Sequence, residues 1–149
     1  MEDYSYIGKS IPRVDAEAKA TGRARYTMDI SMPGMLWGQL LRSPHPHARI
    51  RHIDTSKAEK LPGVKSVIIG KDTPIYYGVT HRDERALHSE KVRFAGDPVA
   101  AVAAVDIETA CEAIDLIEVE YEELPAVFDP EKAMEPGAPL IHELSLIHI

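Results

Sequence analysis

Hydrophobic and polar positions follow a readable order over residues 91–127. A strand ends at the turn Gly96-Asp97-Pro98, and an apolar run follows over residues 99–105. Asp106 then precedes apolar residues at helical spacing, and these are Ile107, Ala110, Cys111, Ile114 and Ile117. In the next segment Ile117, Val119 and Tyr121 alternate with Glu118, Glu120 and Glu122. The pattern predicts a strand–turn–strand–helix–strand unit, in which Asp106 caps the helix and Cys111 lies on its apolar face.

A similar succession of predicted strands and a helix precedes this unit in the sequence. Strands are predicted at 36–42, 48–53 and 64–69, and Gly38 indicates a bulge or a close backbone approach in the first of them. The segment Ser43-Pro44-His45-Pro46-His47 must be an extended connector, because each proline fixes its own φ and restricts its predecessor. Ser56 and Glu59 match a capping box, and Pro62-Gly63 ends the short helix that they begin. Strand–strand–helix–strand therefore occurs twice, at 36–69 and 91–122.

The remaining segments are less regular. Residues 1–20 indicate an irregular arm, 25–30 a short strand closed by the turn Met32-Pro33-Gly34, and 71–89 a long exposed loop. Residues 140–143 are typical of a strand end, whereas the tail 144–149 (LSLIHI) fits nothing before it and is predicted to be non-native. The expected organisation is an arm over 1–20 and a single α+β domain over 21–143, with a mixed sheet and two short helices.

Composition and charge narrow the functional classes. The length of 149 residues suits one domain, and no window approaches the ~20 apolar residues that span a bilayer. The net charge of −7 is uneven, since residues 94–149 carry 13 acidic side chains and only one basic one. Nucleic-acid binding is therefore not expected there, because phosphate contacts require Lys and Arg. A single cysteine excludes an internal disulfide and a cysteine-rich metal site, and with the polar N-terminus it favours the cytoplasm.

Three groups of side chains could carry chemistry. His45, His47 and His52 are close in sequence, with His81 and His88 later, but a zinc site needs three or four converging ligands. The turn Gly96-Asp97-Pro98 has one glycine and precedes a strand, which favours a tight turn over a phosphate-binding loop. The glutamates Glu118, Glu120, Glu122 and Glu123 alternate with apolar residues, which is typical of a solvated strand face rather than of tuned acid–base groups.

The possible nucleophiles lack partners in the sequence. No base is near Cys111 to activate its thiol, and a buried structural cysteine is the simpler interpretation. Ser10, Ser43 and Ser66 occupy no nucleophile-elbow context. On the residues alone, the chain is predicted to be an α+β scaffold module without catalytic, cofactor-binding or metal-binding residues.

Several segments in fixed order resemble a known family. They are Arg13-Val14-Asp15, Lys19-Ala20-Thr21-Gly22, Ala24-Arg25-Tyr26, Leu41-Arg42-Ser43-Pro44-His45-Pro46-His47-Ala48-Arg49-Ile50, Leu61-Pro62-Gly63-Val64, Val92-Arg93-Phe94-Ala95-Gly96-Asp97-Pro98-Val99-Ala100 and Val119-Glu120-Tyr121-Glu122-Glu123-Leu124-Pro125. Together they resemble the start of the molybdopterin-binding large subunit of the xanthine dehydrogenase/aldehyde oxidase family, the α/β hammerhead domain. Within the family, residues 91–104 look most like the alpha subunit of hydroxybenzoyl-CoA reductase.

The resemblance implies a division of labour. In the family a molybdenum–pterin cofactor and a glutamate base perform the oxidoreductase chemistry, and electrons pass through two 2Fe–2S clusters to FAD on other domains or subunits. The pterin-binding segments and the base lie beyond the hammerhead domain, so no catalytic position of this chain corresponds to them. The implied partners are the missing C-terminal molybdenum-binding domains and the iron–sulfur and FAD subunits. The loop 71–89 and Gly96, Asp97 and Pro98 are the candidate inter-domain contacts.

Three functional interpretations follow. The first is an inert N-terminal fragment of a molybdenum-dependent oxidoreductase. The second is an independent non-catalytic module that docks other proteins. The third is a small metal-binding domain that uses the histidines.

Overall fold

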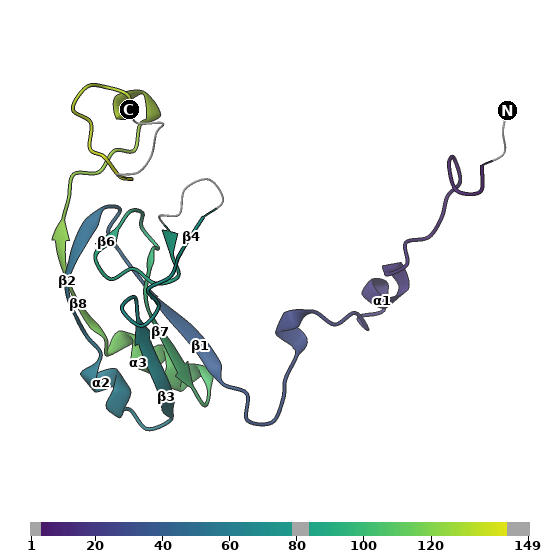
Figure 1. Ribbon diagram of the computed structural model, residues 1–149. Helices are drawn as coiled ribbons and strands as arrows, with labels where there is room; N and C mark the ends of the chain where they lie inside the picture. Colours follow the sequence, from purple (N-terminus) through teal and green to yellow (C-terminus); the bar gives the residue numbers. More distant parts are fainter. Residues whose placement is uncertain (1–3, 79–83, 143–149) are drawn as a thin grey trace. The chain divides into compact units, whose positions relative to one another are not determined.

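The structure is a computed structural model, and it describes residues 4–78 and 84–142 (Figure 1). The chain divides into two units, residues 1–35 and residues 36–149. The predicted tail 144–149 and Glu143 lie outside the described residues. No helix in the described part is long and apolar enough to cross a membrane.

The first unit contains two short helical segments and no buried residue among residues 4–35. The helix α1 spans Ala16–Ala20, so the last five residues of the arm predicted as irregular over 1–20 are helical. The 3-10 helix η1 spans Thr27–Asp29 where a strand was predicted over 25–30. Here the Asp29 carboxylate accepts the Tyr26 backbone N–H at 2.9 Å, and a local side chain–backbone bond of this kind competes with strand pairing.

The second unit contains two three-stranded sheets and a two-stranded hairpin, and all its described strand pairs are antiparallel. The α+β class is confirmed, although the strands form separate sheets rather than one mixed sheet. In chain order the elements are β1 (Trp37–Arg42), β2 (Ala48–Asp54), α2 (Ser56–Lys60), β3 (Val64–Ile69), β4 (Tyr76–Tyr77), β5 (Glu84–Arg85), β6 (Lys91–Val92), β7 (Pro98–Ala104), α3 (Ile107–Asp115), β8 (Glu118–Glu123) and α4 (Pro130–Ala133).

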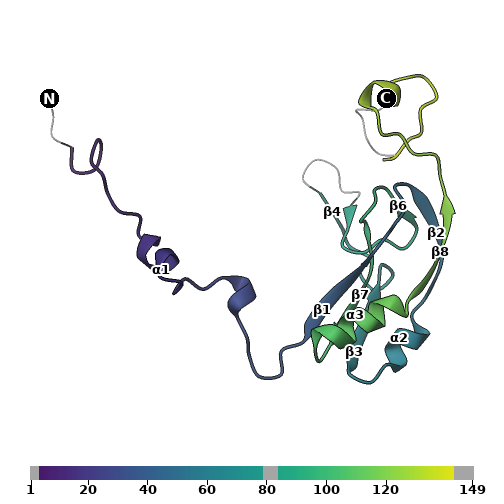
Figure 2. The same ribbon diagram turned by 180° about the vertical axis from the view of Figure 1, so that it is seen from behind.

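The predicted repeat is confirmed in order, and its two copies exchange their central strands. The first copy is β1–β2–α2–β3 and the second is β6–β7–α3–β8. Sheet A has the order β1–β7–β3, and sheet B has the order β6–β2–β8. Each copy therefore supplies the two edges of one sheet and the centre of the other. Neither copy can therefore complete its sheet without strands of the other copy. Figures 1 and 2 show the strands and helices of both copies together in one body.

The main core lies between sheet A and α3. Its buried members include Val102 of β7 and Ala110 and Ala113 of α3, with Ile117 just beyond the helix. The Asp106 side chain accepts the Thr109 backbone N–H at 2.7 Å, as predicted for the helix cap. Cys111 is exposed, so its predicted burial was wrong. The buried stripe is centred on the alanines, which allow the helix to approach the sheet closely, and Cys111 falls outside it.

The first helix of the repeat has a different cap from the predicted one. The helix α2 begins at Ser56, so Ser56 is its first residue rather than its cap. Asp54 accepts the Ser56 backbone N–H at 2.9 Å, and the Thr55 hydroxyl donates to Glu59 at 2.6 Å. The hydrogen bonds from Ser56 lower the pKa of the Asp54 carboxyl. Gly38 was predicted to mark a bulge or a close backbone approach. The bulge lies instead between Leu41 and Arg42, and a Cβ atom on Gly38 would make only an ordinary contact of 3.9 Å with the Val102 carbonyl oxygen.

The segment 71–89 is only partly the exposed loop that was predicted. It contains the strand pair β4–β5, and it ends in Leu87 and His88, which are buried. A Cβ atom on Gly70 would lie 2.5 Å from the Leu87 carbonyl oxygen, because this end of the segment packs directly on the backbone after β3. At the other end of the chain, residues 140–142 form no strand, contrary to prediction.

Candidate functional site

The turn between β6 and β7 forms several hydrogen bonds to other segments of the second unit. Gly96 has φ 101°, and the Asp97 N–H donates to the Phe94 carbonyl at 3.2 Å, so the predicted tight turn is confirmed. Ser43, just after β1, donates its N–H to the Asp97 carbonyl and accepts the Gly96 N–H at its own carbonyl, both at 2.8 Å. The Arg42 guanidinium also donates to the Gly96 carbonyl at 2.8 Å.

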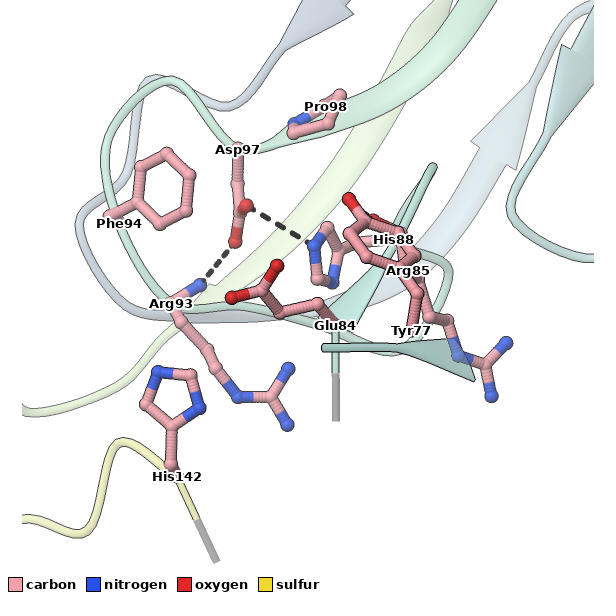
Figure 3. A pocket seen from close by; sticks show the side chains of 9 residues that line it. All are labelled: Tyr77, Glu84, Arg85, His88, Arg93, Phe94, Asp97, Pro98 and His142. Atoms are coloured by element: carbon pink, nitrogen blue, oxygen red, sulfur yellow. Dashed lines mark hydrogen bonds and ion pairs between the residues drawn. The ribbon is translucent and has the colours of Figure 1, made fainter. Parts of the chain in front are cut away.

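The Asp97 side chain points into the protein and is 1% exposed. One carboxylate oxygen accepts the Arg93 backbone N–H at 2.7 Å, and the other lies 3.2 Å from Nε2 of His88 (Figure 3). The His88 backbone N–H donates to the Pro98 carbonyl at 2.8 Å. Asp97 therefore joins three segments of the chain: the end of β1, the segment before β6, and the β6–β7 turn.

A cavity of about 250 Å³ opens beside this carboxylate (Figure 3). Its lining residues are Tyr77, Glu84, Arg85, His88, Arg93, Phe94, Asp97, Pro98 and His142. The His88–Asp97 pair has the form of an oriented acid–base dyad, but the described lining contains no serine, threonine, cysteine or lysine that such a dyad could activate. The pair orders the surrounding backbone, and sequence reasoning missed it because positions 88 and 97 lie on either side of β6.

The predicted contact residues are placed as follows. In Gly96-Asp97-Pro98 the side chain of Asp97 is used internally, so an outside partner could reach only the flanks of the turn and Phe94, which is 56% exposed. Whether the turn contacts another domain stays a prediction. The loop 71–89 lies beside it, since Tyr77, Glu84, Arg85 and His88 line the same cavity.

The histidines in the described part of the chain do not gather with other potential ligands around one point. His47 Nδ1 lies 2.6 Å from the Pro125 carbonyl, and its buried Nε2 has no partner among the described residues. His45 lies 3.5 Å from a Glu123 carboxylate oxygen and packs on the Tyr121 ring. Burial raises the pKa of the Tyr121 hydroxyl. Within residues 4–78 and 84–142, no three His, Cys, Asp or Glu side chains are placed to hold one metal ion.

The acidic strand β8 is paired with basic residues. Glu122 forms ion pairs with Arg49 and Arg51, and Glu118 pairs with Lys57 of α2. The hydrogen bond and the charge of Glu118 raise the pKa of the Lys57 ammonium. The arrangement is that of a solvated face with cross-strand ion pairs, as the alternation of β8 predicted.

The last two histidines complete the placement of the predicted ligands. His52 of β2 lies opposite Glu120, a residue of the acidic strand β8. His81 lies outside the described residues.

The second unit has two three-stranded sheets with exchanged central strands, and the helix α3 packs on one of these sheets. This arrangement matches known proteins. The family model for the aldehyde oxidase and xanthine dehydrogenase a/b hammerhead domain matches residues 21–125. The chain belongs to this family.

Individual relatives are much longer than this chain. It is 46% identical over 133 residues to a probable xanthine dehydrogenase component of Bacillus subtilis, a match that covers 88% of this chain and 18% of that protein. It is 47% identical to the carbon monoxide dehydrogenase large chain of Afipia carboxidovorans, over 92% of this chain and 18% of the relative. A crystal structure of a Cu,Mo-CO dehydrogenase superposes with a TM-score of 0.84 at 45% identity, over 91% of this chain and 18% of that one.

Proposed function

We propose that this chain is the N-terminal structural domain of the large subunit of a molybdenum-dependent oxidoreductase. The observation that carries the proposal is the family match over residues 21–125, together with a fold that superposes on a Cu,Mo-CO dehydrogenase over 18% of its chain. The relatives' names include xanthine, carbon monoxide and nicotinate dehydrogenases, so the parent's substrate is not fixed by this domain. The specific likeness to hydroxybenzoyl-CoA reductase stays a prediction.

The cysteine content of this chain does not fit an iron–sulfur cluster, one of the cofactors that the family resemblance implies. An iron–sulfur cluster of the 2Fe–2S type is held by four protein ligands, usually cysteines, and this chain has one cysteine. In the described part, the buried polar pair His88–Asp97 is occupied by its own internal contacts. As the family resemblance implies, we propose that the molybdenum–pterin cofactor, the iron–sulfur clusters and FAD lie on other domains or subunits, and we derive no catalytic step from these residues.

The role left for the chain is structural. It would pack against the molybdenum-binding domains of the same subunit and against the iron–sulfur and FAD subunits, in the cytoplasm, without nucleic acid or membrane. The exposed flanks of the β6–β7 turn and the adjoining hairpin β4–β5 are proposed contact points. Support comes from Phe94, Tyr76 and Tyr77, which are all about half exposed and lie on these two elements. Aromatic side chains of this kind are enriched in protein interfaces.

Sequencing the gene and assaying two polypeptides would test the proposal. We expect the reading frame to continue after residue 143 for several hundred codons. The longer polypeptide, with its partner subunits, should oxidise or reduce an aldehyde, a purine or an aromatic CoA thioester, and the 149-residue chain should turn over none of them. A native stop codon after residue 149 would favour the independent docking module instead. Turnover by the 149-residue chain alone would contradict the proposal.

A further inference from the structure

The two exchanged sheets are built alike, so their outer faces can be compared position by position. In each sheet, the face toward the core carries the buried apolar residues. Residues that are paired across neighbouring antiparallel strands share a face. The register therefore assigns the outward residues of both sheets without reference to side-chain conformation.

The outer face of sheet B is charged. The cross-strand pairs on it are Arg49–Glu122, His52–Glu120 and Asp54–Glu118. All six side chains are polar, and four of the six residues are exposed. This is the composition expected where an antiparallel sheet faces water.

The outer face of sheet A has no charged residue at the equivalent central positions. Leu40, Ala101 and Ile68 form one row across the three strands, and Gly38, Ala103 and Ser66 form the next. We call these six residues the open face. Leu40 is 41% exposed and Ile68 is 38% exposed, although the alternate residues of the same strands pack into the core.

No helix in the described part of the second unit covers the open face. The helix α3 packs on the opposite side of sheet A, against the buried Ala100, Val102 and Ala104. Figure 2 shows α3 in front of the sheet, and Figure 1, from the other side, shows the sheet in front of α3. Residues 87–89 pack against Gly70, which follows β3 at one end of sheet A. Gly70 is not one of the six residues of the open face.

We propose that the open face is the surface on which the remainder of the large subunit docks. A contiguous exposed apolar patch marks an interaction site, and the small residues at the centre of this one permit close approach of another backbone. The outer face of sheet B is charged, so the uncharged composition of the open face is specific to sheet A. The occupant is inferred from length, because the chain covers 18% of each of the first two relatives and the rest of such a subunit needs a contact with this domain. The inference therefore rests on the proposed function.

Cysteine labelling would test the open face. In a Cys111→Ser background, we would introduce Ile68→Cys or Leu40→Cys on the open face, and Glu120→Cys on sheet B as the matched control. Each variant is prepared as the 149-residue chain and as the full-length subunit, and circular dichroism verifies its fold. The rate of N-ethylmaleimide labelling at the introduced thiol is measured by peptide mass spectrometry, which separates it from other cysteines of the full-length protein.

We expect labelling at positions 68 and 40 to be at least about tenfold slower in the full-length subunit than in the 149-residue chain. Labelling at position 120 should be equally fast in both. Equal labelling at 68 and 120 in the full-length subunit would overturn the inference. So would protection at 68 in the 149-residue chain, because residues 1–35 or a second copy would then be the occupant. Molybdenum content of the same preparation reports separately on the proposed function, so the two failures are distinguishable.

Discussion

The contact between Gly70 and residues 87–89 gives the sharpest test of the packing. A Cβ atom at Gly70 would lie 2.5 Å from the Leu87 carbonyl oxygen and 2.8 Å from the Ser89 nitrogen, and both are backbone atoms. A Gly70→Ala variant must therefore push this segment away by at least about 0.5 Å, since non-bonded carbon contacts are favourable only near 3.5–4 Å. The φ of Gly70 is not positive, so the effect is steric and not conformational.

The expected cost follows from what the segment holds. Overpacking of this kind costs about 1–3 kcal/mol. Moving the segment also weakens the buried His88 N–H to Pro98 carbonyl bond of 2.8 Å, and a bond of this kind contributes about 1 kcal/mol. Alanine recovers about 0.4–1 kcal/mol by restricting the unfolded chain. We expect Gly70→Ala to lower the free energy of unfolding by about 1–3.5 kcal/mol.

Gly38→Ala is the matched control, because a Cβ atom there would lie 3.9 Å from the Val102 carbonyl oxygen, an ordinary contact. It should leave the free energy of unfolding unchanged or raise it by up to about 1 kcal/mol. Urea unfolding of both variants and the parent chain, followed by far-UV circular dichroism, measures the difference. If the two alanine variants agree within about 0.5 kcal/mol, the close packing of residues 87–89 on Gly70 is refuted.

Three further predictions concern single side chains. Asp97→Ala should lower the free energy of unfolding by about 1–3 kcal/mol in urea titrations, because the Arg93 N–H then loses its buried acceptor. A decrease of less than about 0.5 kcal/mol would contradict the connecting role of this carboxylate. Asp106→Ala should destabilise the chain at neutral pH. The hydrogen bonds to Thr109 lower the pKa of the Asp106 carboxyl in the folded state. The stabilisation by Asp106 is therefore complete above the unfolded-state pKa and is lost as pH falls through the lower folded-state pKa. A stability difference between Asp106→Ala and the parent chain that does not change with pH would refute this pH dependence. Native Cys111 should react with Ellman's reagent without denaturant, and Cys111→Ser should change stability by less than about 0.5 kcal/mol; a thiol that reacts only after unfolding would show that it is buried.

The sequence predicted the elements whose local pattern and tertiary role agree. The strands β2, β3 and β7 and the helix α3 lie where periodicity placed them, and the Asp106 cap was correct. For these segments, β-branched runs, the helical stripe and the turn residues all favour the same structure.

Three of the differences depend on tertiary contacts that local sequence patterns do not encode. Strand exchange between the two repeats depends on tertiary pairing, and no property of either repeat alone indicates it. Periodicity alone places Cys111 on the buried stripe of α3, but the face that meets the sheet includes the fully buried Ala113 and leaves Cys111 exposed. The His88–Asp97 pair joins residues on either side of β6 and has no sequence signature.

The central claim is that this domain supports a reactive centre held elsewhere in the protein. Molybdenum per polypeptide, measured by elemental analysis after gel filtration, tests it most directly when the 149-residue chain and the longer polypeptide are isolated from the same host. We predict stoichiometric molybdenum in the longer polypeptide and none in the 149-residue chain. One molybdenum bound to each 149-residue chain would contradict the claim.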